Sequence, residues 1–107
     1  MTTNDFWNVI LHNLITNPRD LPTRPKDSRT PKWFYAYVDG NSIYVANAKN
    51  HSNSSSISVP RRLNFSEFEA IYPIHLRREN GERVSQEATD TTRNQVYWYS
   101  IIHNCII

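Results

Sequence analysis

Glycine is scarce in this chain, since Gly40 and Gly81 are the only two among 107 residues. A loop that wraps a phosphate needs several glycines close together, because a Cβ atom would block the close approach of the backbone. The sequence therefore excludes the glycine-rich nucleotide-binding loops. Gly40 follows an aspartate and Gly81 an asparagine, a pattern typical of turns with positive φ, and we expect a turn at each.

Cysteine and long apolar runs are also nearly absent. Cys105 is the only cysteine, so no internal disulfide can form, which favours a reducing compartment. No segment approaches the roughly 20 apolar residues that a membrane-spanning helix needs. Residues 1–10 lack the basic flank and apolar run of a secretion signal. We therefore expect a cytoplasmic protein with no membrane partner.

Metal-binding and catalytic motifs are lacking as well. The four histidines do not fall at metal-ligand spacings, so we expect no metal and no cofactor. Asp39 followed by Asn47-Ala48-Lys49 resembles the Asp…(Asp/Glu)-x-Lys arrangement of restriction-type nucleases, in which two carboxylates hold a divalent metal. The resemblance covers eleven residues, and Asn47 lacks the second charge. A non-enzymatic protein is the expectation, and a nuclease ranks behind two binding functions.

The net charge of +2 is small but unevenly distributed. Residues 1–64 carry eight basic and four acidic side chains, and residues 65–107 carry four basic and six acidic ones. This asymmetry weakly favours an anionic partner for the first part.

Three helices are expected. Apolar residues recur at helical spacing over residues 4–16, with Thr3 or Asn4 as the cap and Asn17-Pro18 as the end. Asn64 begins a second helix, which Pro73 is expected to end. Residues 96–102 form a nearly continuous apolar run. The length of the segment over residues 92–105 and a cap at Asp90 or Thr91 favour a helix there, and a strand stays open.

The strands are expected mainly in residues 33–47, where two aromatic and β-branched runs flank Asp39-Gly40-Asn41 as in a β-hairpin. A third strand is expected around Ile57 and Val59, and a short one at residues 74–76. The proline-rich residues 17–32 are expected to form a loop. The prediction is one α+β domain over residues 1–107, with the N-terminal and C-terminal helices packed on a small antiparallel sheet.

Alternation along the hairpin sorts its side chains into two faces. The aliphatic face, predicted to be core, contains Phe34, Ala36, Val38, Ile43, Val45 and Asn47. The other face contains Trp33, Tyr35, Tyr37, Tyr44 and Ala46. Exposed aromatic strands beside cations can stack single-stranded bases, so we predict a nucleic-acid site in which the four aromatic residues act together with Lys49, Arg61 and Arg62. The competing interpretation is that a helix covers this face too.

Two other features suggest binding surfaces. Arg77 and Arg78 form a pair that can contact phosphate or carboxylate bidentately, so they are a secondary candidate anion site. The apolar end Ile106-Ile107 suggests a homodimer that buries it. Nucleic acid is therefore the first expected partner, and a protein, including a second copy of the chain, is the alternative.

Overall fold

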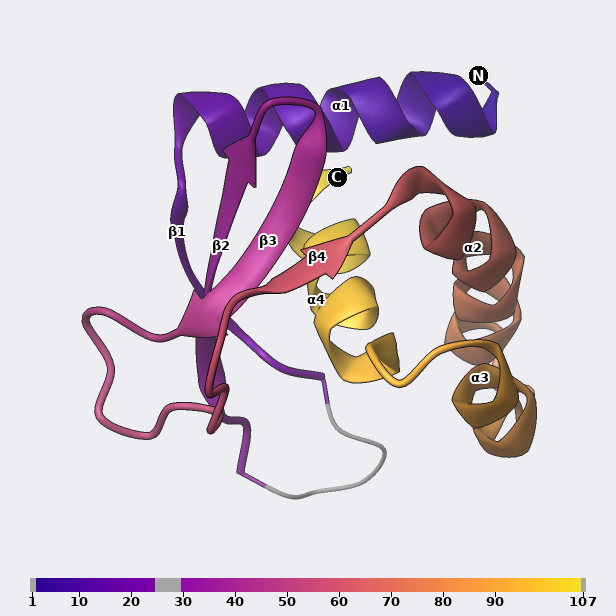
Figure 1. Cartoon of the computed structure of the whole chain (residues 1–107). Helices are drawn as coiled ribbons and strands as arrows, with labels where there is room; N and C mark the ends of the chain where they lie inside the picture. Colours follow the sequence, from indigo (N-terminus) through magenta and orange to yellow (C-terminus); the bar gives the residue numbers. More distant parts are fainter. Residues whose placement is uncertain (1, 25–29, 107) are drawn as a thin grey trace.

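The protein is an α+β domain with four helices and a four-stranded antiparallel sheet in the part that the structure, a computed structural model, describes: residues 2–24 and 30–106. The strands are β1 (Arg19–Pro22), β2 (Trp33–Asp39), β3 (Ser42–Asn47) and β4 (Arg61–Leu63), adjacent in chain order (Figure 1). The helices are α1 (Thr3–Thr16), α2 (Phe65–Glu79), α3 (Ser85–Thr91) and α4 (Gln95–Cys105). The predicted fold class is confirmed.

The N-terminal helix α1 begins one residue earlier than the sequence indicated. Thr2 is its N-cap: the Thr2 hydroxyl accepts from the Asp5 N–H at 3.1 Å, and the Asp5 carboxylate accepts from the Thr2 N–H at 2.8 Å. This reciprocal pair satisfies two backbone donors that the first turn leaves free. Asn17 ends the helix as expected.

The hairpin forms with its two faces as predicted. Asp39 pairs with Ser42 around a two-residue turn, and Tyr37 pairs with Tyr44. Gly40 has φ +63° in this turn, a conformation that side chains with a Cβ atom rarely adopt. Four residues of the aliphatic face are buried, Val38 is half-buried and Asn47 is exposed. All five residues of the opposite face are half-buried.

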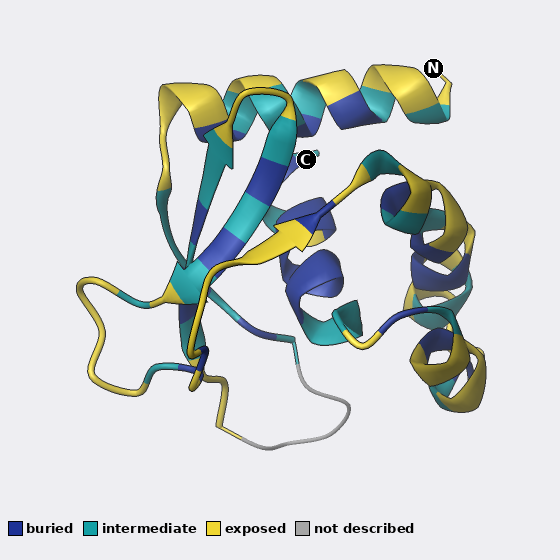
Figure 2. Cartoon of the chain, in the orientation of Figure 1, coloured by how far each residue is buried: buried dark blue, intermediate teal, exposed yellow. Residues whose placement is uncertain are grey.

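The core lies between the aliphatic face of the sheet and the helices (Figure 2). Trp98 of α4 is fully buried and packs against Trp7 of α1 and Phe68 of α2, with ring centroids 6.2 and 5.7 Å apart. The Phe34 ring on β2 meets the Tyr97 ring edge-on at 5.0 Å. Helices α2, α3 and α4 lie to one side of the sheet in Figure 1, and α1 runs along one end of it.

The prediction of a loop over residues 17–32 was wrong at Arg19–Pro22, which form β1 and pair with β2. The strand tolerates Pro22 because it lies at the sheet edge and proline is the last residue of the strand. The proline-rich composition of residues 17–32 did not suggest a contact with the core, but Leu21 provides one, since its side chain is buried there. Residues 25–29 of the predicted loop lie outside the described residues.

Pro73 does not end its helix, because α2 continues through it to Glu79. Proline removes one backbone donor, but Pro73 is exposed, and burial of Ile71, Ile74 and His75 stabilises the helix on both sides of it. The short strand expected at residues 74–76 is therefore helix. Gly81, at φ +88°, follows the helix end as the predicted turn residue.

The third strand is displaced from its predicted position. Strand β4 begins after Pro60, not around Ile57 and Val59. Ile57 still contributes to the core as a buried loop residue, whereas Val59 is exposed.

The C-terminal segment is helical, as favoured, but its cap differs. Asp90 and Thr91 belong to α3, a short helix that the sequence did not predict, and Asn94 precedes α4. No helix of the described residues is both long enough and apolar enough to cross a membrane.

Candidate functional site

Three tyrosines form a continuous row on the face of the sheet opposite the core. Tyr35 and Tyr37 are two residues apart on β2, with ring centroids 5.6 Å apart. Tyr37 lies directly across from Tyr44 on β3, and these two rings are nearly parallel at 5.5 Å. We call Tyr35, Tyr37 and Tyr44 the tyrosine row. The three rings cross two strands, and none of them is fully buried.

A cation lies at each end of the tyrosine row. The Lys49 Nζ atom is 4.2 Å from the centre of the Tyr35 ring. Arg62 on β4 pairs in register with Tyr44, and its Nε donates to the Ser42 hydroxyl at 2.9 Å. The arrangement therefore offers aromatic rings in the middle and positive charge at both ends.

Asp20 on β1 fixes the loop that carries Lys49. Its carboxylate accepts from the N–H groups of Lys49 at 2.9 Å and Asn50 at 2.7 Å, and it is 2.8 Å from the Nδ1 atom of His51. Burial of the Asp20 carboxyl opposes ionisation, but these hydrogen bonds outweigh it and lower its pKa. Asp20 is thus an ionised anchor for the loop, and it holds the backbone of Lys49 in place.

Trp33 is less available for stacking than its predicted role requires. His51 lies flat against the indole, with ring centroids 3.6 Å apart and an interplanar angle of 7°. One ring face of Trp33 is therefore already occupied. The predicted site residue shares the sheet face with the tyrosine row but has its own partner.

Arg61 and Arg62 face opposite sides of the sheet. Arg61 pairs with Val45, a core-face residue, and its guanidinium is 5.9 Å from the Tyr97 ring centre. Its Nη1 donates to the Asn94 side-chain oxygen at 3.2 Å. The structure therefore brings Arg62 to the tyrosine row and places Arg61 beside α4.

A groove of about 480 Å³ borders the tyrosine row where α1 ends. Tyr35, Tyr37 and Lys49 line it on the sheet side, and Leu14, Ile15 and Pro18 line it on the side of α1. Ile15 is 61% exposed, which is unusual for an isoleucine. The groove thus has apolar walls beside aromatic rings and one cation.

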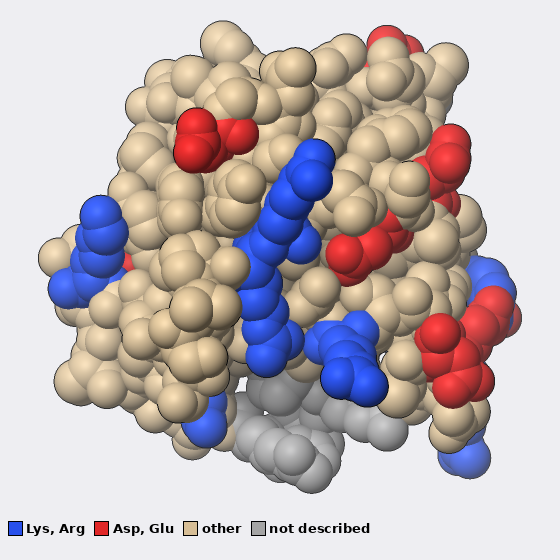
Figure 3. All heavy atoms as spheres, viewed as in Figure 1, with Lys and Arg blue, Asp and Glu red and all other residues tan. Residues whose placement is uncertain are grey.

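The charged side chains are unevenly distributed over the surface, as their counts along the sequence indicate. In the view of Figure 3, lysine and arginine side chains gather near β4, and carboxylates are more frequent toward α2 and α3. This pattern follows the excess of basic residues in the first 64 positions.

The arginine pair at the end of α2 is also divided. Arg77 makes a bidentate contact with Glu87, and its Nε is 3.5 Å from the Glu82 carboxylate. Arg78 instead lies over the Tyr99 ring, 4.4 Å from its centre. The two residues predicted as one anion site have different environments, and Arg77 has carboxylate partners within the protein.

The other groups singled out in the sequence are Asn47, Cys105 and the apolar C-terminal end. The Asn47 side-chain oxygen accepts from the Ile57 N–H at 2.8 Å, so Asn47 holds the following loop. Burial raises the pKa of Cys105 to about 11, which keeps the thiol protonated at neutral pH. Ile106 packs partly against the core, and Ile107 lies outside the described residues. Among the described residues, no three His, Cys, Asp or Glu side chains converge on a possible metal site.

Asp20 and His51 were missed at the sequence level. They are 31 positions apart, in a proline-rich segment and a polar loop, and no local pattern connects them.

Comparisons of the chain with models of protein families, with curated proteins and with solved structures found no match. Function therefore has to be inferred from the geometry of the chain itself.

Proposed function

We propose that the protein is a non-enzymatic module that binds single-stranded nucleic acid on the tyrosine face of its sheet. One observation supports this above the others: the tyrosine row has Lys49 at one end and Arg62 at the other. Ring faces stack on bases, and cations contact phosphates. A row of rings with a cation at each end therefore suits a single strand, which carries both bases and phosphates.

The rings have different roles in this proposal. Tyr37 and Tyr44 are the main stacking platform, because neither has a cation over its ring among the described contacts. Tyr35 already has Lys49 above it, and a base there displaces or joins the ammonium group. The groove beside Tyr35 and Tyr37 gives an unstacked base an apolar wall. Trp33 and Arg61 become peripheral, since His51 and Asn94 engage them.

The test is binding of a fluorescently labelled oligothymidine or oligouridine strand across a salt series. Each stacked base contributes roughly 1–3 kcal/mol, so Tyr37→Leu is expected to weaken binding about 5- to 160-fold. Tyr37→Phe is the matched control, because it keeps the ring and removes only the hydroxyl. Affinity for the wild-type protein is expected to fall as salt rises.

Three results contradict the proposal. The first is that the wild-type protein does not bind the strand even at low salt. Binding that does not depend on salt would remove the role of the cations. Equal affinities for Tyr37→Leu and Tyr37→Phe would remove the role of the ring.

A second candidate is a protein-interaction module, which the exposed Ile15 beside the groove favours. An apolar side chain of a second copy or of another protein fits that position. Sedimentation equilibrium of the wild-type protein and of Ile15→Ser tests self-association. A concentration-dependent dimer lost in Ile15→Ser supports it, and a monomer at all concentrations removes the homodimer.

A further inference from the structure

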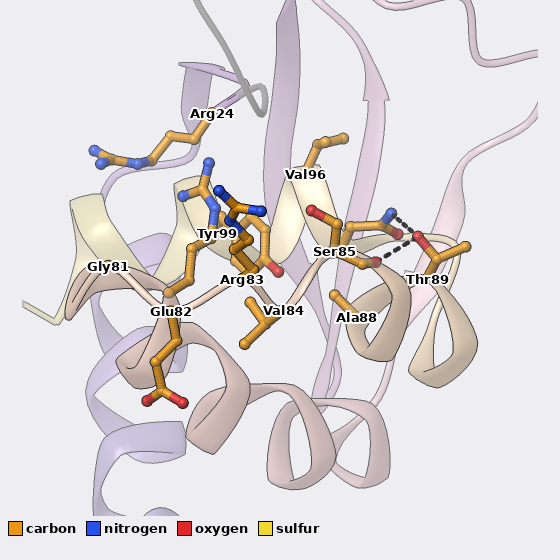
Figure 4. Close-up of a pocket in the computed structure, with 12 residues that line it drawn as sticks. Arg24, Gly81, Glu82, Arg83, Val84, Ser85, Ala88, Thr89, Val96 and Tyr99 are labelled. Carbon is orange, nitrogen blue, oxygen red and sulfur yellow. Dashed lines mark hydrogen bonds between the residues drawn. The ribbon is translucent and has the colours of Figure 1, made fainter.

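A cavity of about 390 Å³ lies between the end of α2, the connection to α3, and α4 (Figure 4). Three arginines line it, but two of them already pair with the Glu79 carboxylate: Nη2 of Arg24 at 3.4 Å and Nη1 of Arg78 at 4.0 Å. The charges around this cavity are therefore largely balanced within the protein, and they do not identify a ligand. The groove at the tyrosine row has a simpler lining.

The lining of this groove is mainly apolar. Among the described residues that form it, Lys49 alone is charged, and the hydroxyls of Tyr35 and Tyr37 are the only other polar side-chain groups. The remaining lining residues are Leu14, Ile15, Pro18, Val38 and Ala46. The described lining thus contains no amide, carboxylate or guanidinium, the side-chain groups that most often read the edges of bases. Any selection among bases in this groove has to come from its apolar surface and its one cation.

Ile15 is the part of the apolar wall that a ligand can reach. It is exposed, as is Pro18 on the same side of the groove, whereas Leu14 is fully buried and supports the wall without contacting a ligand. An exposed isoleucine beside aromatic rings is stabilised when an apolar group covers it, because both surfaces then leave water. The wall therefore favours a base that carries an apolar substituent.

We propose that the groove holds a thymine base and gives the protein a preference for thymine over uracil; this inference rests on the nucleic-acid function proposed above. Thymine carries a methyl group at C5, and this group covers Ile15. Its carbonyl oxygens are acceptors, which suit the donors of the groove, the Lys49 ammonium and the tyrosine hydroxyls. Cytosine and adenine present an amino group in place of a carbonyl, which a neighbouring ammonium group disfavours.

The groove is continuous with the tyrosine row, which is why a base of the same strand is the expected occupant. Tyr35, Tyr37 and Lys49 belong to both. A base in the groove is thus the neighbour of bases stacked on Tyr37 and Tyr44. The Lys49 ammonium has three donors, so it can contact a thymine carbonyl and a phosphate of the strand together.

The test compares oligodeoxythymidine with oligodeoxyuridine of equal length, because these strands differ only in the methyl group of each base. Fluorescence anisotropy titrations of the full chain are expected to show about fourfold tighter binding of the thymidine strand, the change expected when one methyl group is buried. Ile15→Ser is expected to bring this ratio close to one, because it removes the apolar wall. The affinity for the uridine strand is expected to change little.

Leu76→Ser is the matched control, because Leu76 is also an apolar residue exposed on a helix and lies outside the groove. It is expected to keep the preference of the wild-type protein. Ile15→Leu retains an apolar wall and is expected to keep the preference too. Circular dichroism establishes that each variant is folded.

The outcomes separate the role of the groove from nucleic-acid binding itself. Equal binding of both strands by the wild-type protein overturns the preference but leaves the proposed function standing. A preference that persists in Ile15→Ser arises from the tyrosine row and overturns the role of the groove. If neither strand binds, the proposed function fails and the preference fails with it. A dimer that is lost in Ile15→Ser, together with equal binding of the two strands, assigns the groove to a second copy of the chain.

Discussion

Arg62 lies directly across from Tyr44 in the β3–β4 register, and its guanidinium is held there by the Ser42 hydroxyl. Its neighbour Arg61 projects to the other side of the sheet. Two adjacent arginines of the same strand therefore have opposite surroundings. This difference provides an internal control for the proposed nucleic-acid face.

We expect Arg62→Ala to weaken binding to a single-stranded oligonucleotide and to reduce the salt dependence, because one phosphate contact is lost. The slope of log K against log salt is expected to change by about 0.7 for one contact with a single strand. Arg61→Ala is expected to leave the slope unchanged. Fluorescence anisotropy titrations at several salt concentrations measure both. An equal loss of affinity in Arg62→Ala and Arg61→Ala would show that binding does not depend on which face of the sheet the arginine occupies.

Glu67 connects two helices through one carboxylate oxygen. This oxygen accepts from the Thr92 hydroxyl at 2.7 Å, the Asn94 amide at 3.0 Å and the Trp98 indole at 3.4 Å. We expect Glu67→Ala to lower the free energy of unfolding by about 2–4 kcal/mol, since it leaves these donors without a charged acceptor. Urea denaturation measures the change.

Glu69→Ala is the control for this prediction, because Glu69 is an exposed residue of the same helix. A change within about 0.5 kcal/mol is expected there. If Glu69→Ala destabilises the protein as much as Glu67→Ala, the loss is not specific to the contacts between α2 and α4.

Local patterns predicted much of this fold. Strand alternation and the Asp39-Gly40-Asn41 turn were sufficient for the two faces of the hairpin, because these depend on neighbours in the chain, but they left its register open. Helical spacing was sufficient for α1, and the length of the apolar run for α4. The same alternation separates Arg61 from Arg62, but only once β4 is known to contain both.

The errors arose where tertiary packing overrides local preference. Pro73 is a helix breaker in isolation, yet the buried residues on both sides of it keep α2 intact. Helix α3 has only Ala88 as a buried residue, so it carried no apolar periodicity to find. The cavity lining brings Arg24 together with residues 78–99, and no pattern within either segment indicates that contact.

Buried His75 gives the protein a pH dependence of stability. Burial lowers its pKa to about 4, below the value of about 6.5 for an unfolded chain. The unfolded chain therefore takes up a proton between these values that the folded protein does not. Stability is complete above pH 6.5 and falls by roughly 3 kcal/mol as the pH drops to about 4. Urea denaturation from pH 4 to 7 measures this slope.

His75→Phe is expected to flatten the slope between pH 4 and 6.5. Phenylalanine retains ring packing against Tyr99, whose centroid is 5.6 Å away, and the His75 Nδ1 atom has no hydrogen-bond partner to lose. His12→Gln, at an exposed position of α1, is expected to keep the slope of the wild-type protein. A slope that persists in His75→Phe would assign the pH dependence to other groups.

Asp20 connects the stability of the loop to the proposed site, since it holds the backbone of Lys49. Its pKa is lowered in the folded protein, so its contribution is present above the unfolded value of 3.8 and is lost as the pH falls through the folded pKa. We expect Asp20→Asn to cost about 2 kcal/mol at pH 7, because an amide cannot accept at both of its ends. Below pH 3.8 the difference from the wild-type protein is expected to shrink.

Asp20→Asn also changes the proposed binding face without removing any group that contacts a ligand. When the loop is released, Lys49 loses its fixed position over Tyr35, so affinity for a single strand is expected to fall although the ammonium group remains. Asp39→Asn, in the exposed hairpin turn, removes the same charge and is expected to leave both stability and affinity nearly unchanged. If Asp20→Asn and Asp39→Asn bind an oligonucleotide equally well, the positioning of Lys49 by Asp20 is not part of recognition, and only the charge of Lys49 contributes.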